Sequence, residues 1–303
     1  RVYRLKAHEI PMAGRNARGT AIVNLLPLQP SEHIQAIIDT RDYETNRYLF
    51  FATRKGRVKK TRFNEYDSSL KAGLIAIKLN EDDELVAVIP TNGSDDVLMV
   101  SRSGQTVRFN EGDVRPMGRA AAGVTGMRFR GDDELVSCDV AKPGGTLFIV
   151  TSAGFGKRTP VDRFPTKGRG GLGVRGIRIT EQRGTVAAAF MVNDGDEVFL
   201  VASGGVIIRI PVSSVSVQGR DATGVRIMNL DEGQYVAAAA LVQERDDESN
   251  GSDESGSDDS PDSDSSVNEA DASSEVDDTT AATEVDGSMS EAETTDVDDA
   301  NGD

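Results

Sequence analysis

A repeat of about 50 residues runs through most of this chain and limits the folds open to it. The motif Gly-Arg-x-x-x-Gly occurs four times, and a weaker copy between the first two keeps only the final glycine. The final glycines stand at positions 19, 73, 123, 173 and 224, with separations of 54, 50, 50 and 51 residues. A fixed period of this length is typical of architectures in which each unit needs its neighbours to complete a core. The full copies are 14–19, 118–123, 168–173 and 219–224.

Two further markers keep the same order in successive copies. A glycine followed four residues later by a cation precedes the motif, and a valine follows 12 or 13 residues after the closing glycine. Short runs rich in valine and isoleucine lie between the markers and are bounded by Gly, Asn and Asp, which predicts strands. The pairs are Gly56 and Lys60, Gly104 and Arg108, Gly154 and Arg158, and Gly205 and Arg209, and the valines are Val86, Val136, Val186 and Val236.

Roughly four short strands in each unit of about 50 residues predict the blades of a propeller. The predicted fold class is all-β, a propeller-like disc of four-stranded blades. Blade and repeat boundaries need not coincide, because propeller blades often take a strand from a neighbouring repeat. The predicted folded domain is 1–243, with repeats at about 1–40, 41–92, 93–142, 143–193 and 194–243.

Charge divides the chain into two parts. Residues 244–303 carry 23 acidic residues and one basic residue, a net charge of -22, whereas residues 1–243 have a net charge of +6. The acidic part has almost no large apolar residue, so we predict a disordered tail that cannot offset the entropy of ordering. A tail of this charge is expected to compete with a polyanion for the basic part, at high effective concentration. The alternative is a tail that only spaces or solubilises.

Residue types typical of catalysis or metal binding are scarce. The chain has two histidines and one cysteine, Cys138, and these do not form a cluster with metal-ligand spacing. The acidic runs 81–84 and 132–134 lack the staggered spacing of a calcium loop and are interpreted as solvated turns. We therefore predict neither catalytic residues nor a metal or cofactor in this chain. The lack of a run of 18 apolar residues predicts no membrane span, and a single cysteine fits a reducing cytoplasm.

Cations recur at equivalent repeat positions and predict an arc of positive charge. Such an arc suits the phosphates of duplex DNA and binds it without sequence preference, because phosphate contacts position DNA but do not specify it. For any one of these residues, an ordinary solvated face is an equally good interpretation. The candidate DNA-binding residues are Arg15, Arg18, Lys59, Lys60, Lys71, Lys78, Arg108, Arg119, Arg128, Lys157, Arg158, Lys167, Arg169, Arg175, Arg178, Arg209, Arg220 and Arg226.

Six segments resemble the C-terminal domain of bacterial DNA gyrase A. They begin with Arg-Val-Tyr-Arg-Leu-Lys at 1–6 and Ile-Val-Asn-Leu-Leu-Pro-Leu at 22–28, and the similarity extends over essentially all of 1–243. The resemblance implies a β-pinwheel that wraps duplex DNA chirally, so that the type II topoisomerase introduces negative supercoils. The other segments are 58–61, 76–85, 154–159 and 219–225.

The resemblance also implies what lies outside this chain. The family's box, Gln-Arg-Arg-Gly-Gly-Lys-Gly, precedes the first matched strand, so we expect an N-terminally truncated domain. Lys167-Gly168-Arg169-Gly170-Gly171-Leu172-Gly173 is similar to that box but departs from it at three positions. The DNA-cleaving tyrosine, ATP and Mg²⁺ are implied to belong to the rest of an A2B2 holoenzyme, with gyrase B and a second gyrase A as partners in a bacterial, nucleoid-associated location. The alternatives are the equivalent domain of topoisomerase IV and a propeller that binds proteins.

Overall fold

Short antiparallel hairpins build the part of the chain that the computed structural model describes, which is residues 1–242 except 15, 31, 40–46, 69 and 71. These residues belong to one unit, Arg1–Asp247. The predicted tail, Arg15 and Lys71 therefore lie outside the described residues. Within the described part, no helix has the length and apolar character required to cross a membrane. The helices there are single 3-10 turns: Ala7–Glu9, Ile22–Asn24, Phe63–Tyr66, Glu111–Asp113, Val161–Arg163, Glu181–Arg183 and Val212–Ser214.

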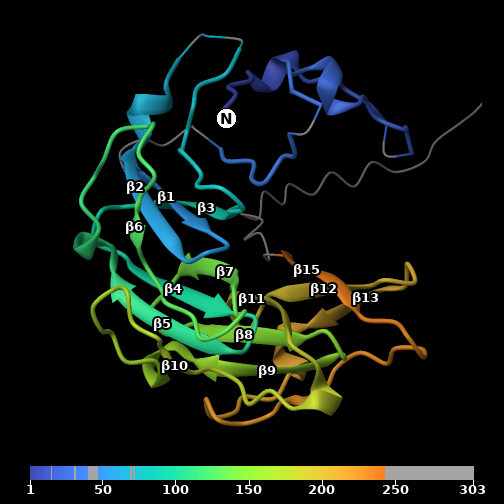
Figure 1. Ribbon diagram of the computed structural model, residues 1–303. Helices are drawn as coiled ribbons and strands as arrows, with labels where there is room; N and C mark the ends of the chain where they lie inside the picture. Colours follow the sequence, from blue (N-terminus) through green and yellow to red (C-terminus); the bar gives the residue numbers. More distant parts are fainter. Residues whose placement is uncertain (15, 31, 40–46, 69, 71, 243–303) are drawn as a thin grey trace, which may run out of the picture. The chain divides into compact units, whose positions relative to one another are not determined.

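The strands of the described residues form three four-stranded sheets and one three-stranded sheet. Figure 1 shows how most of these strands are arranged. This arrangement confirms the predicted all-β, propeller-like fold class. The first sheet has the order β3-β1-β2-β6, with β1 Tyr48–Thr53, β2 Arg57–Arg62, β3 Leu85–Thr91 and β6 Val124–Thr125. The second has the order β10-β5-β4-β7, with β4 Asp96–Ser101, β5 Gln105–Asn110, β7 Leu135–Val140 and β10 Val174–Arg175. The third has the order β11-β8-β9-β14, with β8 Thr146–Thr151, β9 Phe155–Pro160, β11 Val186–Val192 and β14 Val225–Arg226. The last has the order β13-β12-β15, with β12 Glu197–Ala202, β13 Ile207–Pro211 and β15 Val236–Val242.

Each four-stranded sheet contains a two-residue strand from the following repeat. β6 pairs with β2, β10 with β5, and β14 with β9, and each short strand begins directly after a closing glycine. Gly123 has φ +83°, and a Cβ placed on it would lie 2.4 Å from the carbonyl oxygen of Val58. The closing glycine is therefore required because a positive φ and a close backbone approach coincide at the point where one repeat enters the sheet of another.

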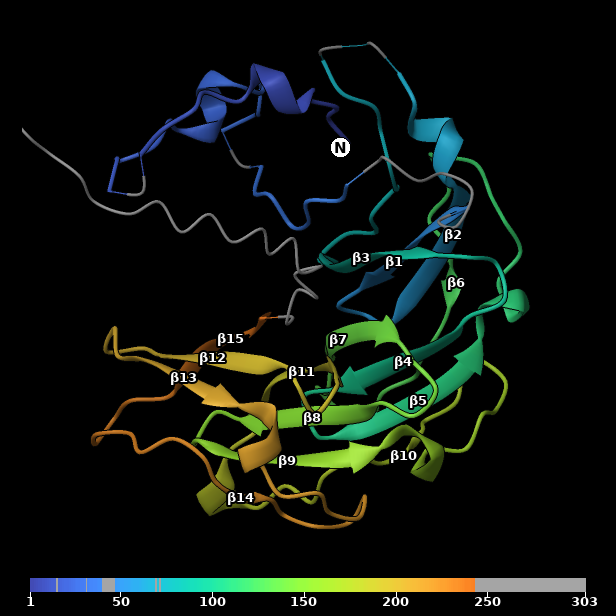
Figure 2. The same ribbon diagram turned by 180° about the vertical axis from the view of Figure 1, so that it is seen from behind.

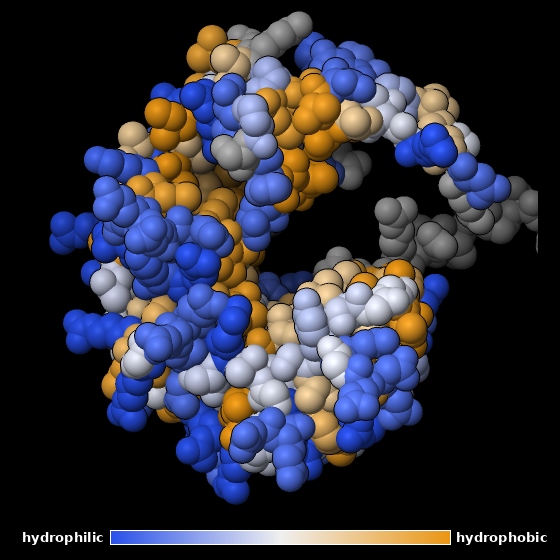
Figure 3. Space-filling model, turned by 45° about the vertical axis from the view of Figure 1, so that its right-hand side comes forward, coloured by the Kyte–Doolittle hydropathy of each residue, from blue (hydrophilic) through white to orange (hydrophobic). Residues whose placement is uncertain are grey.

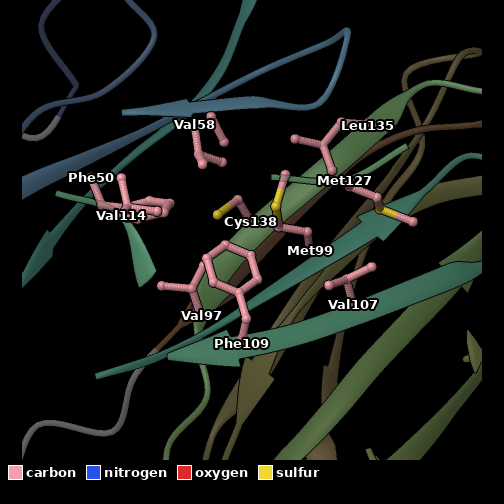
Figure 4. Packing of buried hydrophobic residues seen from close by; sticks show 11 residues of the cluster. Phe50, Val58, Val97, Met99, Val107, Phe109, Val114, Met127, Leu135 and Cys138 are labelled. Carbon is pink, nitrogen blue, oxygen red and sulfur yellow. The ribbon is translucent and has the colours of Figure 1, made fainter. Parts of the chain in front are cut away.

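The core lies between successive sheets, which explains why the central strands are continuously apolar. In β4, Val97 and Met99 point into the cluster shared with the first sheet, whereas Leu98 and Val100 point into the cluster shared with the third. Figure 4 shows the first of these clusters, in which Phe50 of β1 lies near Phe109 of β5, with ring centroids 6.3 Å apart. Burial on both faces removes the polar alternation that a half-exposed strand would show.

Residues 1–39 contain little regular structure among the residues described. Val2 forms an isolated bridge with Leu74, the residue after Gly73, at the register that joins Val58 to Val124 one repeat later. Figure 2 shows this N-terminal segment from behind, with its two 3-10 turns. The first repeat therefore keeps one pairing of the pattern.

Candidate nucleic-acid interface

We call Gly56, Gly104, Gly154 and Gly205 the opening glycines. The cations four residues after the first three of them point inward and contact the next repeat. Lys60 is 3% exposed, and its ammonium donates to the backbone oxygen of Glu111 at 2.8 Å and lies 3.4 Å from a carboxylate oxygen of the same residue. The Glu111 carboxylate is fully buried and also accepts from Thr91 at 2.8 Å. A buried charge needs such partners.

Arg108 and Arg158 occupy the same position in the next two repeats and make equivalent contacts. Arg108 donates to Asp96 at 2.9 Å and to the carbonyl oxygens of Val161 and Phe164 at 3.1 and 3.3 Å. Arg158 is 5% exposed, donates to the Val215 carbonyl at 2.7 Å and pairs with Asp194. These three cations are enclosed and already bonded, which argues against direct phosphate contact by them.

Arg209, at the same position of the last repeat, differs from the other three. It is exposed and pairs with Glu197 of its own hairpin, and its guanidinium lies 5.8 Å from the ring centroid of Phe199. Among the described residues, β13 has no two-residue partner strand of the kind that covers β2, β5 and β9. The cation therefore stays at the surface where no following repeat covers it.

We call the segments 118–123, 168–173 and 219–224 the Gly-Arg loops. Two more predicted DNA contacts, Lys59 and Lys157, are fully buried behind the first and the last of these loops. The Lys59 ammonium donates to the carbonyl oxygens of Ala76 and Arg119, and the Lys157 ammonium donates to that of Gly219 at 2.5 Å. Burial lowers the pKa of both lysines to about 8. Their placement argues against a direct contact with DNA.

Backbone hydrogen bonds place other predicted cations beside these loops. The residue five positions after Gly73, Gly123 and Gly173 donates its amide to the Gly-Arg loop of the following repeat. Lys78 donates to Ala121 at 3.3 Å, and Arg128 donates to Gly171 at 3.0 Å. Arg178 donates to Ala222 at 3.1 Å in the same way. Two sets of cations that are far apart in sequence are thereby brought together at these three junctions between repeats.

The cations at these junctions are exposed or half-exposed, and we call them the cationic row. Figure 3 shows hydrophilic residues along much of the outer margin of the visible surface. Since Arg119 and Arg220 are half-exposed and the other members exposed, a ligand along the loops can reach all of them. The cationic row is Lys78, Arg119, Arg128, Lys167, Arg169, Arg175, Arg178 and Arg220. The other predicted contacts that lie at the surface are Arg18 and Arg226, besides Arg209.

Grooves lie along two of the loops at equivalent places. One of about 850 Å³ is bounded by Arg163, Arg175 and Arg220 together with Asp162 and Asp221. A second of about 670 Å³ runs between the Gly118–Ala121 part of the first loop and Gly73–Ile75, with Arg119 on its wall. Arginines on the walls of an open groove favour an extended anionic ligand rather than a small enclosed one. Arg163 was not predicted, because it falls outside the repeated positions.

One carboxylate interrupts the cationic row. Asp221 pairs with Arg178 and Arg175, and the hydrogen bonds from these two arginines lower the pKa of its carboxyl. Asp221 follows the loop arginine at a position where the other loops have Ala120 and Gly170. Asp221 therefore lowers the net positive charge of the row at the last junction.

The box-like segment 167–173 is held by its own arginine together with backbone hydrogen bonds. Arg169 donates to the carbonyl oxygens of Asp113 at 3.0 Å and Thr125 at 2.9 Å, and the amide of Gly170 donates to Gly126 at 2.6 Å. Gly173 has φ +78°, and a Cβ there would lie 2.5 Å from the Thr106 carbonyl oxygen. At least one of its glycines therefore serves the close approach of protein backbone.

Comparison with known proteins gives a consistent set of similarities. A sequence profile described as "DNA gyrase C-terminal domain, beta-propeller" matches residues 1–39, 47–92, 95–142, 145–193 and 196–243. The DNA gyrase A of Mycobacterium bovis (strain BCG / Pasteur 1173P2) is 43% identical over 260 residues, which cover 85% of this chain and 31% of that protein. That of Salmonella typhimurium (strain LT2) is 42% identical over 244 residues, covering 80% and 28%. The chain thus spans about a third of the length of the curated relatives it matches.

Solved structures show the same architecture. The C-terminal domain of a DNA topoisomerase IV superposes with a TM-score of 0.72 at 28% identity and covers 78% of this chain and 74% of its own. A DNA gyrase A C-terminal domain superposes with a TM-score of 0.68, also at 28% identity, and covers 78% and 77%.

Proposed function

This chain belongs to the family of DNA gyrase C-terminal domains, and from that membership we propose that it binds duplex DNA without sequence preference and wraps it chirally. The membership confirms the resemblance inferred from the sequence. The observation that supports binding most is the pairing of cations across each junction, where Lys78, Arg128 and Arg178 lie beside the next Gly-Arg loop. A row of cations on successive repeats suits a ligand whose charges recur along a line.

Wrapping would serve the supercoiling reaction of a complete gyrase. We propose that the chain is the wrapping part of a gyrase A, which is a component of an ATP-dependent type II topoisomerase in the bacterial cytoplasm. The proposed partners are duplex DNA, gyrase B and a second gyrase A in an A2B2 assembly. ATP, Mg²⁺ and the DNA-cleaving tyrosine would belong to the other parts of that enzyme. This chain would supply the curvature and the phosphate contacts.

A salt titration with random-sequence duplex tests the proposal. If the eight cations of the row each neutralise one phosphate, the slope of log K against log salt should be about -7. Bending stiff duplex costs on the order of several kcal/mol over a few tens of base pairs, which distributed contacts would offset. A chain that binds no duplex at low salt would contradict the proposal and favour a propeller that binds proteins.

The C-terminal domain of topoisomerase IV remains the second candidate, because one such domain superposes with a TM-score of 0.72. The sequence similarity to DNA gyrase A, 43% over 85% of this chain, favours gyrase. The coding sequence upstream of Arg1 distinguishes the two candidates. A Gln-Arg-Arg-Gly-Gly-Lys-Gly box there supports gyrase, and a full-length upstream sequence without one supports topoisomerase IV.

We further propose that the acidic segment 244–303 reduces wrapping by competing with DNA for the cations. Its net charge of -22 is joined covalently to a part with a net charge of +6, so its effective concentration is high. Removing 244–303 should raise the affinity for duplex at low salt, with a smaller gain at high salt because the competition is screened. Equal affinities of the chain with and without this segment at low salt would contradict the competition and favour a segment that only spaces or solubilises.

A further inference from the structure

Lys59 and Lys157 occupy one repeat position, three residues after the opening glycines Gly56 and Gly154. Both side chains are fully buried, whereas the intervening repeat has Val107 at this position. An apolar residue is therefore compatible with the fold here, and the lysines do something that core packing alone does not require. A buried ammonium is costly unless it is fully bonded.

The Lys59 ammonium holds the first Gly-Arg loop from behind. It donates to the backbone oxygen of Arg119, and Arg57 donates to the oxygen of Ala122 at 3.1 Å and to that of Gly123. The Tyr66 hydroxyl lies 3.4 Å from the same ammonium. Two cations of the preceding repeat thus fix the loop at both its ends.

The Lys157 ammonium holds the last Gly-Arg loop in the same way. It donates to the backbone oxygens of Gly219 and Arg220 at 2.5 and 2.9 Å. Arg183 donates to the oxygen of Gly224 at 2.7 Å and lies over the ring of Phe155, 4.3 Å from its centroid. Arg57 and Arg183 stand at different positions of the repeat, but each donates to backbone oxygens at the C-terminal end of a Gly-Arg loop.

The middle loop provides the contrast. Behind it stands Val107, and its own Arg169 donates to the oxygens of Asp113 and Thr125. In the first and last loops the backbone oxygen of the loop arginine accepts from a buried lysine. In the middle loop the arginine side chain itself holds the segment in place.

We propose that Lys59 and Lys157 are positioning residues whose ammonium groups fix the backbone at Arg119 and Arg220, so that both guanidinium groups are held ready for DNA phosphates. This inference rests on the proposed DNA binding. A loop that is already ordered loses less entropy when it binds, so its contribution to affinity is larger. The middle loop does not depend on these lysines.

The two lysines also make the arrangement sensitive to pH. Burial is the main cause that lowers their pKa to about 8. The charges of Arg119 near Lys59 and of Arg220 near Lys157 lower the pKa further, whereas those of Glu65 and Asp221 raise it. Above that pH each amine keeps two donors instead of three and loses its charge-assisted bonds. DNA affinity should therefore fall between pH 7 and 9.

Folding stability should not follow that fall. A lysine in the unfolded chain titrates near 10.5, so the unfolded state binds more protons between about pH 8 and 10.5. The contribution of these lysines to the free energy of unfolding consequently rises with pH over that range. Opposite trends in affinity and stability separate a positioning role from a purely structural one.

The test compares two double variants of the 303-residue chain with the unmodified chain. Lys59→Met and Lys157→Met together remove both buried ammonium groups. Lys55→Met and Lys142→Met remove the same charge from exposed positions outside the row. At pH 7 the buried pair should weaken binding to random duplex by about tenfold and the exposed pair by about twofold at most. The unmodified chain should lose affinity between pH 7 and 9, and the buried-pair variant should not.

Hydrogen exchange at pH 7 reports on the loops without DNA. Amides of 118–123 and 219–224 should exchange faster in the buried-pair variant, whereas those of 168–173 should not change. Equal affinities of the two double variants, or equal exchange in all three loops, would overturn the inference. If the buried-pair variant does not fold, an unchanged affinity of the unmodified chain between pH 7 and 9 overturns it. If the unmodified chain binds no duplex at low salt, the proposed function fails instead, and the exchange data still decide whether the lysines hold the loops.

Discussion

Replacing Arg108 with methionine should cost stability and leave the phosphate contacts in place. The Arg108 guanidinium donates to Asp96 at 2.9 Å and to the carbonyls of Val161 and Phe164 at 3.1 and 3.3 Å, and its side chain is 16% exposed. Methionine has a similar apolar stem but no donor. Two carbonyls and one carboxylate would each lose one hydrogen bond, at about 1 kcal/mol each, while Asp96 keeps its bonds from Asn110 and Thr166. The free energy of unfolding should therefore fall by about 2–4 kcal/mol.

Arg209→Met is the matched control, because Arg209 occupies the same repeat position at the surface. Its side chain is 55% exposed and pairs with Glu197 of its own hairpin. An exposed pair of this kind contributes about 0–1 kcal/mol. Urea unfolding followed by circular dichroism measures both changes, and a salt titration with duplex DNA measures the number of phosphate contacts.

The two measurements together distinguish a side chain that stabilises the junction between repeats from one that contacts DNA. We expect Arg108→Met to lower the urea midpoint and to keep the salt slope of the unmodified chain under conditions where it is folded. An unchanged urea midpoint together with a salt slope smaller by about one would refute this reasoning. Arg108 would then have to leave its pocket and reach phosphate.

Three further tests address the roles of Asp221, Gly123 and the box-like segment. Asp221→Asn should release Arg175 and Arg178 and remove a negative charge beside the phosphates, so that duplex affinity rises about two- to fivefold, and an unchanged affinity would show that these arginines do not contact DNA. Gly123→Ala should lower the unfolding free energy in a urea titration by more than about 1 kcal/mol, because φ is +83° and the new Cβ would meet Val58. Gly118→Ala is the control, because open space surrounds Gly118, and it should change the unfolding free energy by less than about 0.5 kcal/mol. Equal effects of the two substitutions would contradict the close-approach argument. Lys167→Ala with Arg169→Ala should weaken duplex binding and reduce the salt slope by about one for each lost contact, and loss of wrapping with binding intact would make 167–173 a second box.

The fold was predictable because its constraints recur in the sequence. A glycine such as Gly123 must stand wherever a repeat enters the neighbouring sheet, so the spacing of glycines revealed the unit. The marker valines at 86, 136, 186 and 236 lie in β3, β7, β11 and β15. The exchange of β6, β10 and β14 between sheets was expected in kind, but its register follows from close backbone contacts that the repeat alone does not specify.

The repeat did not reveal whether each cationic side chain points into the protein or toward solvent. A fixed spacing identifies equivalent positions in successive repeats but does not distinguish a buried position from an exposed one. The signal for Lys59 and Lys157 was present at equivalent positions, where Val107 and Ile208 are apolar. Lys60, Arg108 and Arg158 carried no such signal, because each is a cation and the backbone oxygens that accept from it lie in the next repeat, more than 50 residues away.

Ligation of nicked circular DNA in the presence of the chain tests the central claim most directly, because it measures wrapping without the catalytic parts of a gyrase. Chiral wrapping traps a writhe of one sign, so the circles closed by ligase should show a shift in linking number of one sign that grows with the ratio of protein to DNA. Chain lacking both the Lys167 and Arg169 side chains should produce a smaller shift at equal occupancy. A linking number that stays at the value of free DNA while the duplex is fully bound would contradict chiral wrapping.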